Sequence, residues 1–234
     1  MNKILISTAT FNESKNIEIF LRRVINLKIN LDILIVDDNS PDGTSRKIIK
    51  FKSKHKNIFL IKRSHKLGLD SAHKTIYKYA LGKKYDYLIT MDADLSHDPK
   101  IIPNFLKYIK YYHCVTGSRY IKSGRNDLKG YRFFLSKYGN KFIKLILNIN
   151  LNEFTTSYRC FNLKKLRNFH LDKVKAKGYS FFMDTIYLLN KLGYSVKEIP
   201  IIFHQRNHGK SKIPKLEIFR TLIYIILIKI NFLR

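Results

Sequence analysis

The chain has 234 residues, of which 45 are Lys or Arg and 17 are Asp or Glu, so its formal net charge is +28. Hydrophobic side chains make up 45% of the residues, which is too large a share for a disordered basic tail. The charged side chains must therefore lie on the surface of a packed domain. The only two cysteines, Cys114 and Cys160, support neither a disulfide framework nor a zinc site, and a reducing, cytosolic setting fits them best.

No stretch of the sequence is expected to cross a membrane. The apolar run before Asn12 is too short for a secretory signal, and the longest apolar stretch, residues 221–228, falls well short of the ~20 residues that a spanning helix needs. The strong basic charge is compatible with nucleic acid, an anionic membrane surface or a phosphorylated small molecule as partner. A solvated lysine surface without a binding role is the fourth explanation.

The first 120 residues alternate strand and helix patterns, which predicts an α/β fold with a mainly parallel sheet flanked by helices. The pattern predicts strands at residues 3–8, 31–36, 57–62, 85–91 and 113–117. A helix is expected from Glu13 onward with Asn12 as its N-cap, and Thr44 can cap the next one. Further helices are predicted over 70–81 and after Pro99, which suits a first helical position.

The remainder of the chain is less regular. After a basic loop at 118–130 we expect an apolar helix over 131–149, as core or acceptor-channel wall, and a helix near 181–192. Residues 195–203 resemble a strand near a sheet edge because they contain Pro200. We expect a catalytic unit over 1–212 and an apolar, basic tail helix over 213–234. That tail would lie on an anionic membrane surface or pack on the domain or on a partner membrane subunit.

Carboxylates follow two of the predicted strands. Asp92-Ala93-Asp94 comes after the strand at 85–91, and Asp37-Asp38 comes after the strand at 31–36. Ligands bind beyond the carboxyl ends of parallel strands, and paired carboxylates there suit Mg²⁺ or Mn²⁺. The plainer interpretation is that an Asp of this loop caps the following helix. Cations are expected to meet so many acids at one edge, and the candidates are Lys66, Arg119, Arg125 and Arg206.

Several segments in this order and spacing resemble the dolichyl-phosphate and polyprenyl-phosphate mannosyltransferases of the inverting glycosyltransferase family 2, which has a GT-A fold. They are TATFNE, VDDNSPDGT, KLGLDSAH, MDADLSHDP, GSRY, TTSYR, GYSFFMD and EIPIIFHQRNHGKSK. The resemblance extends from Lys3 to Lys212. It implies an enzyme that moves mannose from GDP-mannose to a dolichyl or polyprenyl monophosphate with Mg²⁺ or Mn²⁺.

The resemblance also implies roles for individual residues. The donor nucleotide would be bound by Ala9, Phe11, Glu13, Val36, Asp38, Asp92 and Ala93. Asp92, Asp94 and Ser96 would hold the metal, while Arg119, Arg206 and Lys212 would bind donor and acceptor phosphates. Asp94 with its metal would be the main catalytic element, together with Asp92 and Arg119.

The sequence departs from the family pattern at several positions. Ala9 and Phe11 stand where relatives have Pro and Tyr, and Asp70 stands where they have Gly. Ser157 and Tyr158 replace Gly and Phe, and Asp184 stands where many relatives have Glu. The change at Phe11 leaves open which nucleobase is read.

A lipid phosphate needs no general base, because a phosphate monoester has a second pKa of about 6 and is largely dianionic at neutral pH. We therefore predict no catalytic base and expect His73 and His97 to serve as hydrogen-bonding residues. Transfer from UDP-glucose, or to a glycan, remains an enzyme alternative. Nucleic-acid binding is the distant alternative, since it leaves the acidic strand ends unexplained. The expected location is peripheral, on the cytoplasmic face of a membrane, with a membrane-protein partner as an option.

Overall fold

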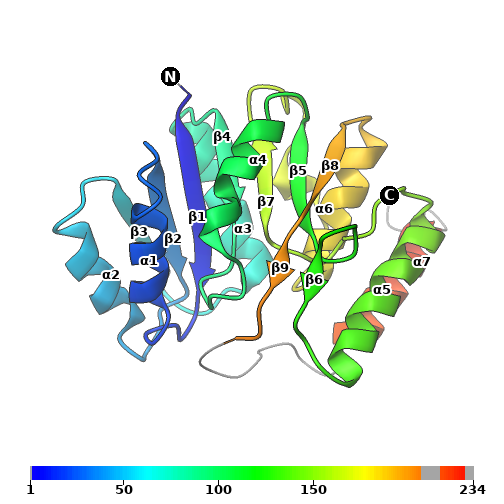
Figure 1. The fold of residues 1–234 in the computed structure, drawn as a ribbon, viewed down its shortest axis with the longest axis horizontal. Helices are drawn as coiled ribbons and strands as arrows, with labels where there is room; N and C mark the ends of the chain where they lie inside the picture. The colour runs from blue at the N-terminus through cyan, green and yellow to red at the C-terminus, as the bar shows by residue number, and fades with distance from the viewer. Residues whose placement is uncertain (1, 207–216, 230–234) are drawn as a thin grey trace.

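A seven-stranded sheet forms the centre of the fold, in the order β3-β2-β1-β4-β7-β5-β8 (Figure 1). The computed structural model describes residues 2–206 and 217–229. The strands of the sheet are β1 (Ile4–Thr10), β2 (Asp32–Asp37), β3 (Ile58–Lys62), β4 (Tyr87–Thr90), β5 (Cys114–Ser118), β7 (Arg159–Asn162) and β8 (Val196–Pro200). A second, two-stranded sheet pairs β6 (Arg125–Asn126) with β9 (Ile202–Phe203).

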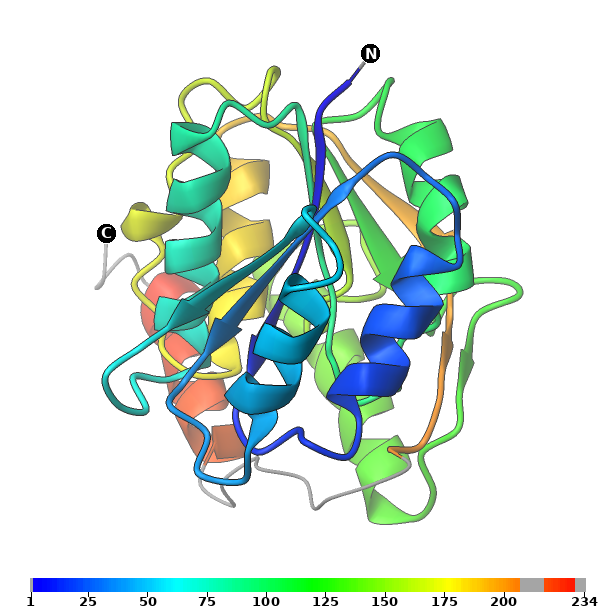
Figure 2. The same cartoon turned by 90° about the vertical axis from the view of Figure 1, so that its left-hand side faces the viewer.

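Helices cover both faces of the large sheet (Figure 2). On one face α1 (Ile17–Ile25), α2 (Thr44–Lys52) and α4 (Ile102–Tyr108) contribute to one buried cluster. On the other face α3 (Leu69–Gly82), α5 (Tyr131–Leu147), α6 (Ser180–Lys191) and α7 (Glu217–Lys229) contribute to a second cluster. Short 3₁₀ turns lie at Pro99–Ile101 and Leu171–Lys173. The predicted α/β architecture is therefore confirmed.

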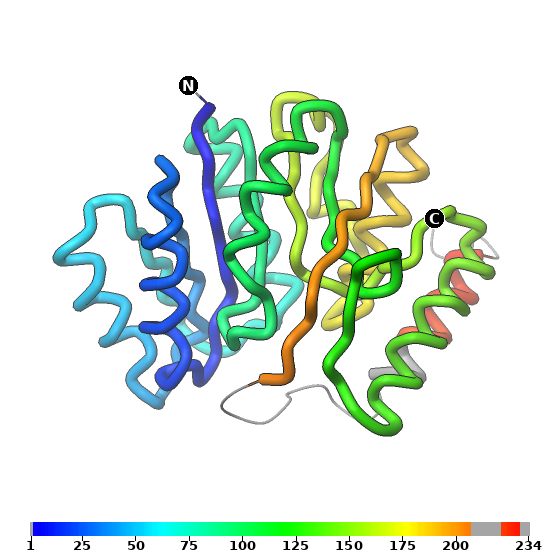
Figure 3. The backbone as a smooth tube through the Cα atoms, in the orientation of Figure 1, coloured from blue at the N-terminus to red at the C-terminus, as the bar shows by residue number. Residues whose placement is uncertain are grey.

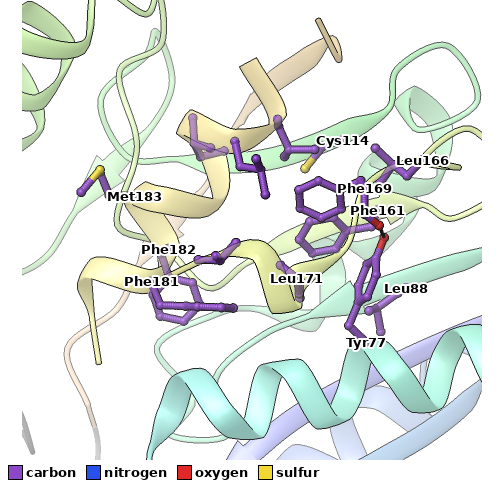
Figure 4. Close-up of a cluster of buried hydrophobic side chains, with 14 of the residues drawn as sticks. Tyr77, Leu88, Cys114, Phe161, Leu166, Phe169, Leu171, Phe181, Phe182 and Met183 are labelled. Atoms are coloured by element: carbon purple, nitrogen blue, oxygen red, sulfur yellow. Dashed lines mark hydrogen bonds between the residues drawn. The ribbon is translucent and has the colours of Figure 1, made fainter. Parts of the chain in front are cut away.

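Several aromatic side chains pack together within the second cluster (Figure 4). The Tyr77 ring of α3 meets the rings of Phe161 and Phe169 edge-on, at 6.0 Å and 5.7 Å between centroids. Its buried hydroxyl donates a hydrogen bond to the Phe169 carbonyl at 3.2 Å, which satisfies the polar end of an otherwise apolar side chain. This packing fixes the segment after β7 against α3 and thereby holds β7 in the middle of the sheet.

The five strands predicted from apolar runs are all present, with ends that differ by at most two residues. The first helix, however, begins at Ile17 and not at Glu13. Its N-cap position is Asn16, because a turn in which the Asn16 and Ile17 N–H groups donate to the Glu13 carbonyl precedes the helix, and Asn12 lies outside it with a positive φ of 57°. Thr44 is not an N-cap either. Gly43 occupies that position with φ 87°, and Thr44 is the first helical residue. Asp98 does cap the turn that Pro99 opens, by accepting from the Lys100 N–H at 3.0 Å.

The strand β7 runs antiparallel to both of its neighbours. It begins at the edge where the parallel strands end, so the TTSYR segment before it lies beside the loop after β4. The strand β8 is at the sheet edge, as Pro200 led us to expect. From there the chain continues through β9 toward the same carboxyl edge (Figure 3). Residues distant in sequence therefore converge at one rim of the sheet.

Among the described residues, no helix combines the length and the apolar character that crossing a bilayer requires. The helix α7 packs on the domain: Ile225 and Ile228 are buried in the second cluster. Its Tyr224 hydroxyl donates to the buried Asp184 carboxylate at 2.7 Å. The predicted boundary between 212 and 213 falls outside the described residues, so the two-part division stays a prediction.

Candidate active site

Asp94 lies in the loop after β4 and is almost completely buried. Its Oδ1 accepts hydrogen bonds from the Ser96 hydroxyl and from the Ser96 N–H, at 2.5 Å and 3.1 Å. Leu95 between them has a positive φ of 69°, which curls the loop back on itself. Burial alone would raise the pKa of Asp94, but the Ser96 hydrogen bonds and the Arg206 charge hold it below its usual value.

Arg206 joins Asp94 to the loop after β1. Its Nε and Nη2 lie 2.9 Å and 2.7 Å from Asp94 Oδ2, and its Nη1 lies 3.5 Å from Glu13 Oε1. Glu13 is itself held by Asn16, whose amide donates to Oε2 at 2.7 Å. The predicted donor-binding, metal-binding and phosphate-binding residues Glu13, Asp94 and Arg206 thus meet at one point.

Asp92 is oriented differently from Asp94. Its Oδ1 accepts a hydrogen bond from the Ser157 hydroxyl at 2.6 Å, and 39% of its side chain is exposed. Its backbone N–H donates to His97 Nδ1 at 3.1 Å. Since Nδ1 is therefore an acceptor, the 3.8 Å approach of His97 Nδ1 to Asp92 Oδ2 is not an ion pair. Burial lowers the pKa of His97, which is consistent with a neutral ring.

The two acids after β2 have other partners than expected. Asp37 accepts hydrogen bonds from the hydroxyls of Thr10, Ser40 and Ser45 and from the Ser40 N–H, and it is fully buried. It therefore ties the end of β1 to the loop after β2 and to the start of α2. β1 also separates β2 from β4, so the strands carrying the two acid pairs are not direct neighbours.

Asp38 is paired with Arg63, a residue that the sequence analysis missed. The Arg63 guanidinium also reaches the Ser71 hydroxyl and the Gly68 carbonyl, which ties the end of β3 to the start of α3. The sequence feature that could have identified Arg63 is its position directly after β3, a strand that ends at this edge of the sheet. Asp38 accepts a second hydrogen bond from the Gly68 N–H at 3.2 Å.

Arg119 is a further buried arginine at the rim. Its Nε and Nη2 donate to the two oxygens of the buried Glu153 at 2.6 Å and 2.7 Å. Burial opposes ionisation of Glu153, but the Arg119 charge outweighs it and lowers its pKa. Glu153 was also missed, because nothing in its sequence surroundings signals a buried acid. Phosphate binding by Arg119 stays a prediction.

The remaining predicted residues are dispersed. Lys66 lies over the Phe11 ring at 4.5 Å, and Arg125 pairs with Asp127. The side chains of Val36 and Ala93 are buried and that of Ala9 is half-buried, so nucleotide contacts there would use the backbone. Lys212 lies outside the described residues. Neither of two surface cavities, of about 420 Å³ and about 1000 Å³, is lined by a predicted site residue.

The carboxylates of this loop have the chemistry that Mg²⁺ or Mn²⁺ prefers. The described part of the chain holds no cluster of three or more His, Cys, Asp or Glu arranged for a metal ion. Two carboxylates on one loop nevertheless fit these cations, which take one or two protein carboxylates and complete their shell with phosphate oxygens and water. Asp92 and Asp94 would be the ligands, and Ser96 would support Asp94.

The sequence is similar to known glycosyltransferases. Residues 6–169 match the model of glycosyl transferase family 2. The undecaprenyl-phosphate mannosyltransferase of Micrococcus luteus is 32% identical over 211 residues, which cover 90% of this chain and 87% of that protein. The polyprenol monophosphomannose synthase of Mycolicibacterium smegmatis is 31% identical over 213 residues, which cover 90% of this chain and 80% of that protein.

Solved structures share the fold at low identity. The glucosyl-3-phosphoglycerate synthase of Mycobacterium tuberculosis, in complex with UDP, gives a TM-score of 0.68 at 15% identity, over 98% of this chain and 80% of that chain. A mannosyltransferase of Pyrobaculum calidifontis, in complex with GDP-Man and Mn²⁺, gives a TM-score of 0.56 at 16% identity, over 97% of this chain and 70% of that chain. The sheet and its helical layers are therefore those of GT-A-like glycosyltransferases.

Proposed function

This chain belongs to glycosyl transferase family 2, and we propose that it transfers mannose from GDP-mannose to a polyprenyl or dolichyl monophosphate with the help of Mg²⁺ or Mn²⁺. The single observation that carries the proposal is the convergence of Asp92, Asp94, Glu13 and Arg206 at the carboxyl edge of the sheet. An arginine that already contacts an acidic loop is suited to meet a diphosphate at the same place.

The sugar and the acceptor are inferred from the relatives. Both curated relatives described above carry mannose and a polyprenyl or polyprenol phosphate in their names and align with 90% of this chain. The choice of GDP as the donor nucleotide is supported by the Pyrobaculum calidifontis structure in complex with GDP-Man, which shares only the fold.

The reaction forms a bond between a lipid phosphate oxygen and the anomeric carbon, while the bond from that carbon to the diphosphate oxygen of GDP breaks and its electron pair leaves with GDP. Attack from the opposite face inverts the anomeric centre. The dianionic phosphate is its own nucleophile, so no side chain has to remove a proton. His97 is buried and its Nδ1 already accepts the Asp92 N–H, so the proposal assigns this ring a structural role and no proton transfer.

The protein's contribution is binding, orientation and charge compensation. Arg206, whose side chain is 23% exposed, and Arg119 would contact the donor and acceptor phosphates, together with Lys212. A divalent cation held by Asp92 and Asp94 would stabilise the charge on the departing diphosphate. Glu13 and Asp38 would bind the nucleotide.

The acceptor lipid resides in a bilayer, and we propose that the enzyme acts at the cytoplasmic surface of a membrane. Helix α5 exposes Tyr131, Phe134, Tyr138 and Leu145, each to more than half of its area. Helix α7, which contacts α5, exposes Ile223 and Ile226 to 57% and 51%. Lysines on the same two helices complement anionic headgroups. A membrane-protein partner could cover the same face.

The decisive experiment supplies the purified protein with Mn²⁺, a short polyprenyl phosphate and radiolabelled GDP-mannose, UDP-glucose or other nucleotide sugars in parallel. We expect label in the organic phase with GDP-mannose alone. Transfer from UDP-glucose alone would show that the donor is UDP-glucose and not GDP-mannose. Label found only on an added glycan would show that the acceptor is a glycan and not a lipid phosphate. Asp94→Asn should abolish the transfer without unfolding the protein. Salt-sensitive binding of nucleic acid without any transfer would support the distant alternative.

A further inference from the structure

We propose that Ser157 is a positioning residue that presets Asp92 to offer one carboxylate oxygen to the divalent cation. The inference rests on the proposed metal-dependent transfer and assigns a role to a residue of the TTSYR segment that the site residues above do not include. Ser157 is only 3% exposed, so its hydroxyl is directed into the protein and not toward solvent.

Two hydrogen bonds fix Ser157 against the strand that carries Asp92. Its hydroxyl donates to Asp92 Oδ1 at 2.6 Å. Its carbonyl accepts from the Thr90 hydroxyl at 2.6 Å, and Thr90 is the last residue of β4. The next residue, Tyr158, is bonded to β5 through its carbonyl, which accepts from the Gly117 N–H at 2.9 Å. Ser157 therefore belongs to a rigid frame, and its donor hydroxyl has a defined direction.

The backbone of Asp92 is fixed as well. Its N–H donates to Nδ1 of His97, whose ring packs against the rings of Tyr158 and Phe203 at 4.9 Å and 5.4 Å between centroids. With the backbone and Oδ1 both held, the remaining oxygen of Asp92 can take few orientations. Within the part of the chain that the structure describes, Oδ2 accepts no hydrogen bond, while 39% of the side chain is exposed.

Asp94 differs from Asp92 in the partners of its carboxylate oxygens. Both oxygens of Asp94 have donors, namely Ser96 at Oδ1 and Arg206 at Oδ2. Asp92 is therefore the carboxylate that can bind a cation without first breaking an ion pair. Hydrogen bonds that orient a metal ligand typically contribute 10-fold to 100-fold to metal affinity.

The test compares two variants that each remove one hydroxyl from the same segment. Ser157→Ala removes the donor to Asp92. Tyr158→Phe is the matched control, because its hydroxyl donates at 3.0 Å to the Asp98 carbonyl and not to a carboxylate. Mn²⁺ affinity is measured by the electron paramagnetic resonance signal of free Mn²⁺ with GDP present. Asp92→Asn is the reference variant, because it shows how far the affinity falls when the carboxylate ligand itself is lost.

We expect Ser157→Ala to raise the Kd for Mn²⁺ about 10-fold or more, while Tyr158→Phe leaves it within about two-fold. In transfer assays the Mn²⁺ concentration for half-maximal rate should rise in parallel for Ser157→Ala, with kcat recovered at saturating Mn²⁺. An unchanged Kd in Ser157→Ala, or equal shifts in both variants, would overturn the positioning role while leaving the proposed function intact. Failure of the unaltered protein to bind Mn²⁺ with GDP would overturn both.

Discussion

Arg206 donates to Asp94 Oδ2 from two of its nitrogens, although 112 positions separate the two residues in the sequence. The guanidinium occupies the oxygen through which Asp94 would bind a metal. Cation binding by Asp94 would therefore be coupled to release of Arg206, and the released arginine would become available to the diphosphate of the donor.

Arg206→Gln should consequently bind Mn²⁺ several-fold more tightly than the unaltered protein when no nucleotide is present, because the competing cation is gone. The same variant should transfer mannose about 10-fold to 100-fold more slowly, since a charged phosphate contact is lost. Arg125→Gln is the control, because it makes the same change in net charge at an arginine paired with Asp127. Equal Mn²⁺ affinities in the two variants would refute the competition.

Asp37→Asn should destabilise the protein by about 2 to 4 kcal/mol. The carboxylate accepts four hydrogen bonds between 2.6 Å and 3.0 Å, and an amide would turn one acceptor into a donor that faces hydroxyls and an N–H. Urea unfolding followed by circular dichroism measures the loss. Asp172→Asn, at an exposed position, should change the stability by less than about 0.5 kcal/mol. A similar small loss in Asp37→Asn would show that the rim tolerates the amide.

His73 should make the fold sensitive to acid. Burial, with a smaller contribution from the Arg159 charge, lowers its pKa from 6.5 to about 3. The unfolded chain therefore binds a proton that the folded chain rejects, and stability present above pH 6.5 is lost as the pH falls toward 3. Between pH 8 and pH 5 the loss from this residue is about 2 kcal/mol.

The matched variant is His73→Phe, which keeps a ring against Phe181 and Phe182. Its stability, measured by urea unfolding at pH 8 and pH 5, should fall about 2 kcal/mol less than that of the unaltered protein. His97 also has a lowered pKa but is present in both proteins, so its contribution cancels. Parallel losses in the two proteins would show that His73 is accessible to protons in the folded state.

Substitution of the exposed apolar positions of α7 should weaken membrane binding. The double variant Ile223→Ser and Ile226→Ser removes two side chains that are more than half exposed, and we expect several-fold lower binding to vesicles containing anionic lipid. Tyr111→Ser, at a position that is 74% exposed outside both helices, is the control. Removing the whole helix is less informative, because Ile225 and Ile228 belong to the core. Unchanged vesicle binding by the double variant would exclude this face of α7.

The sequence was sufficient for the strands of the fold that are buried on both faces. Such strands produce continuous apolar runs, as in residues 31–36 and 87–90, and the runs were read correctly. The strand β7 has only four residues, RCFN, with no apolar run and an orientation opposite to its neighbours. Its place between β4 and β5 depends on contacts across the sheet, such as those of Cys160 with Ile89 and Val115, which a local pattern does not contain.

Most of the charged residues of the candidate site could be predicted from the sequence, but the ion pairs between them could not. The acids at 92 and 94 stood out because they follow a buried strand, and Arg206 was one of four candidate cations. Which cation meets which acid depends on the path of the chain after β9, and sequence spacing carries no record of that path. Arg63 and Glu153 were missed for the same reason, since each is recognisable only when its buried partner is in place.

The contact between Arg206 and Glu13 spans 193 positions of the chain. During synthesis the first loop of the site leaves the ribosome long before the arginine that meets it, by about 10 to 40 seconds at ordinary translation rates. The layers around β1 to β4 can form in that interval, and Arg63 can already pair with Asp38, but Glu13 and Asp94 lack their arginine until the residues after β9 have emerged. The arginine that bridges the loops after β1 and β4 is therefore among the last parts of the site to be synthesised.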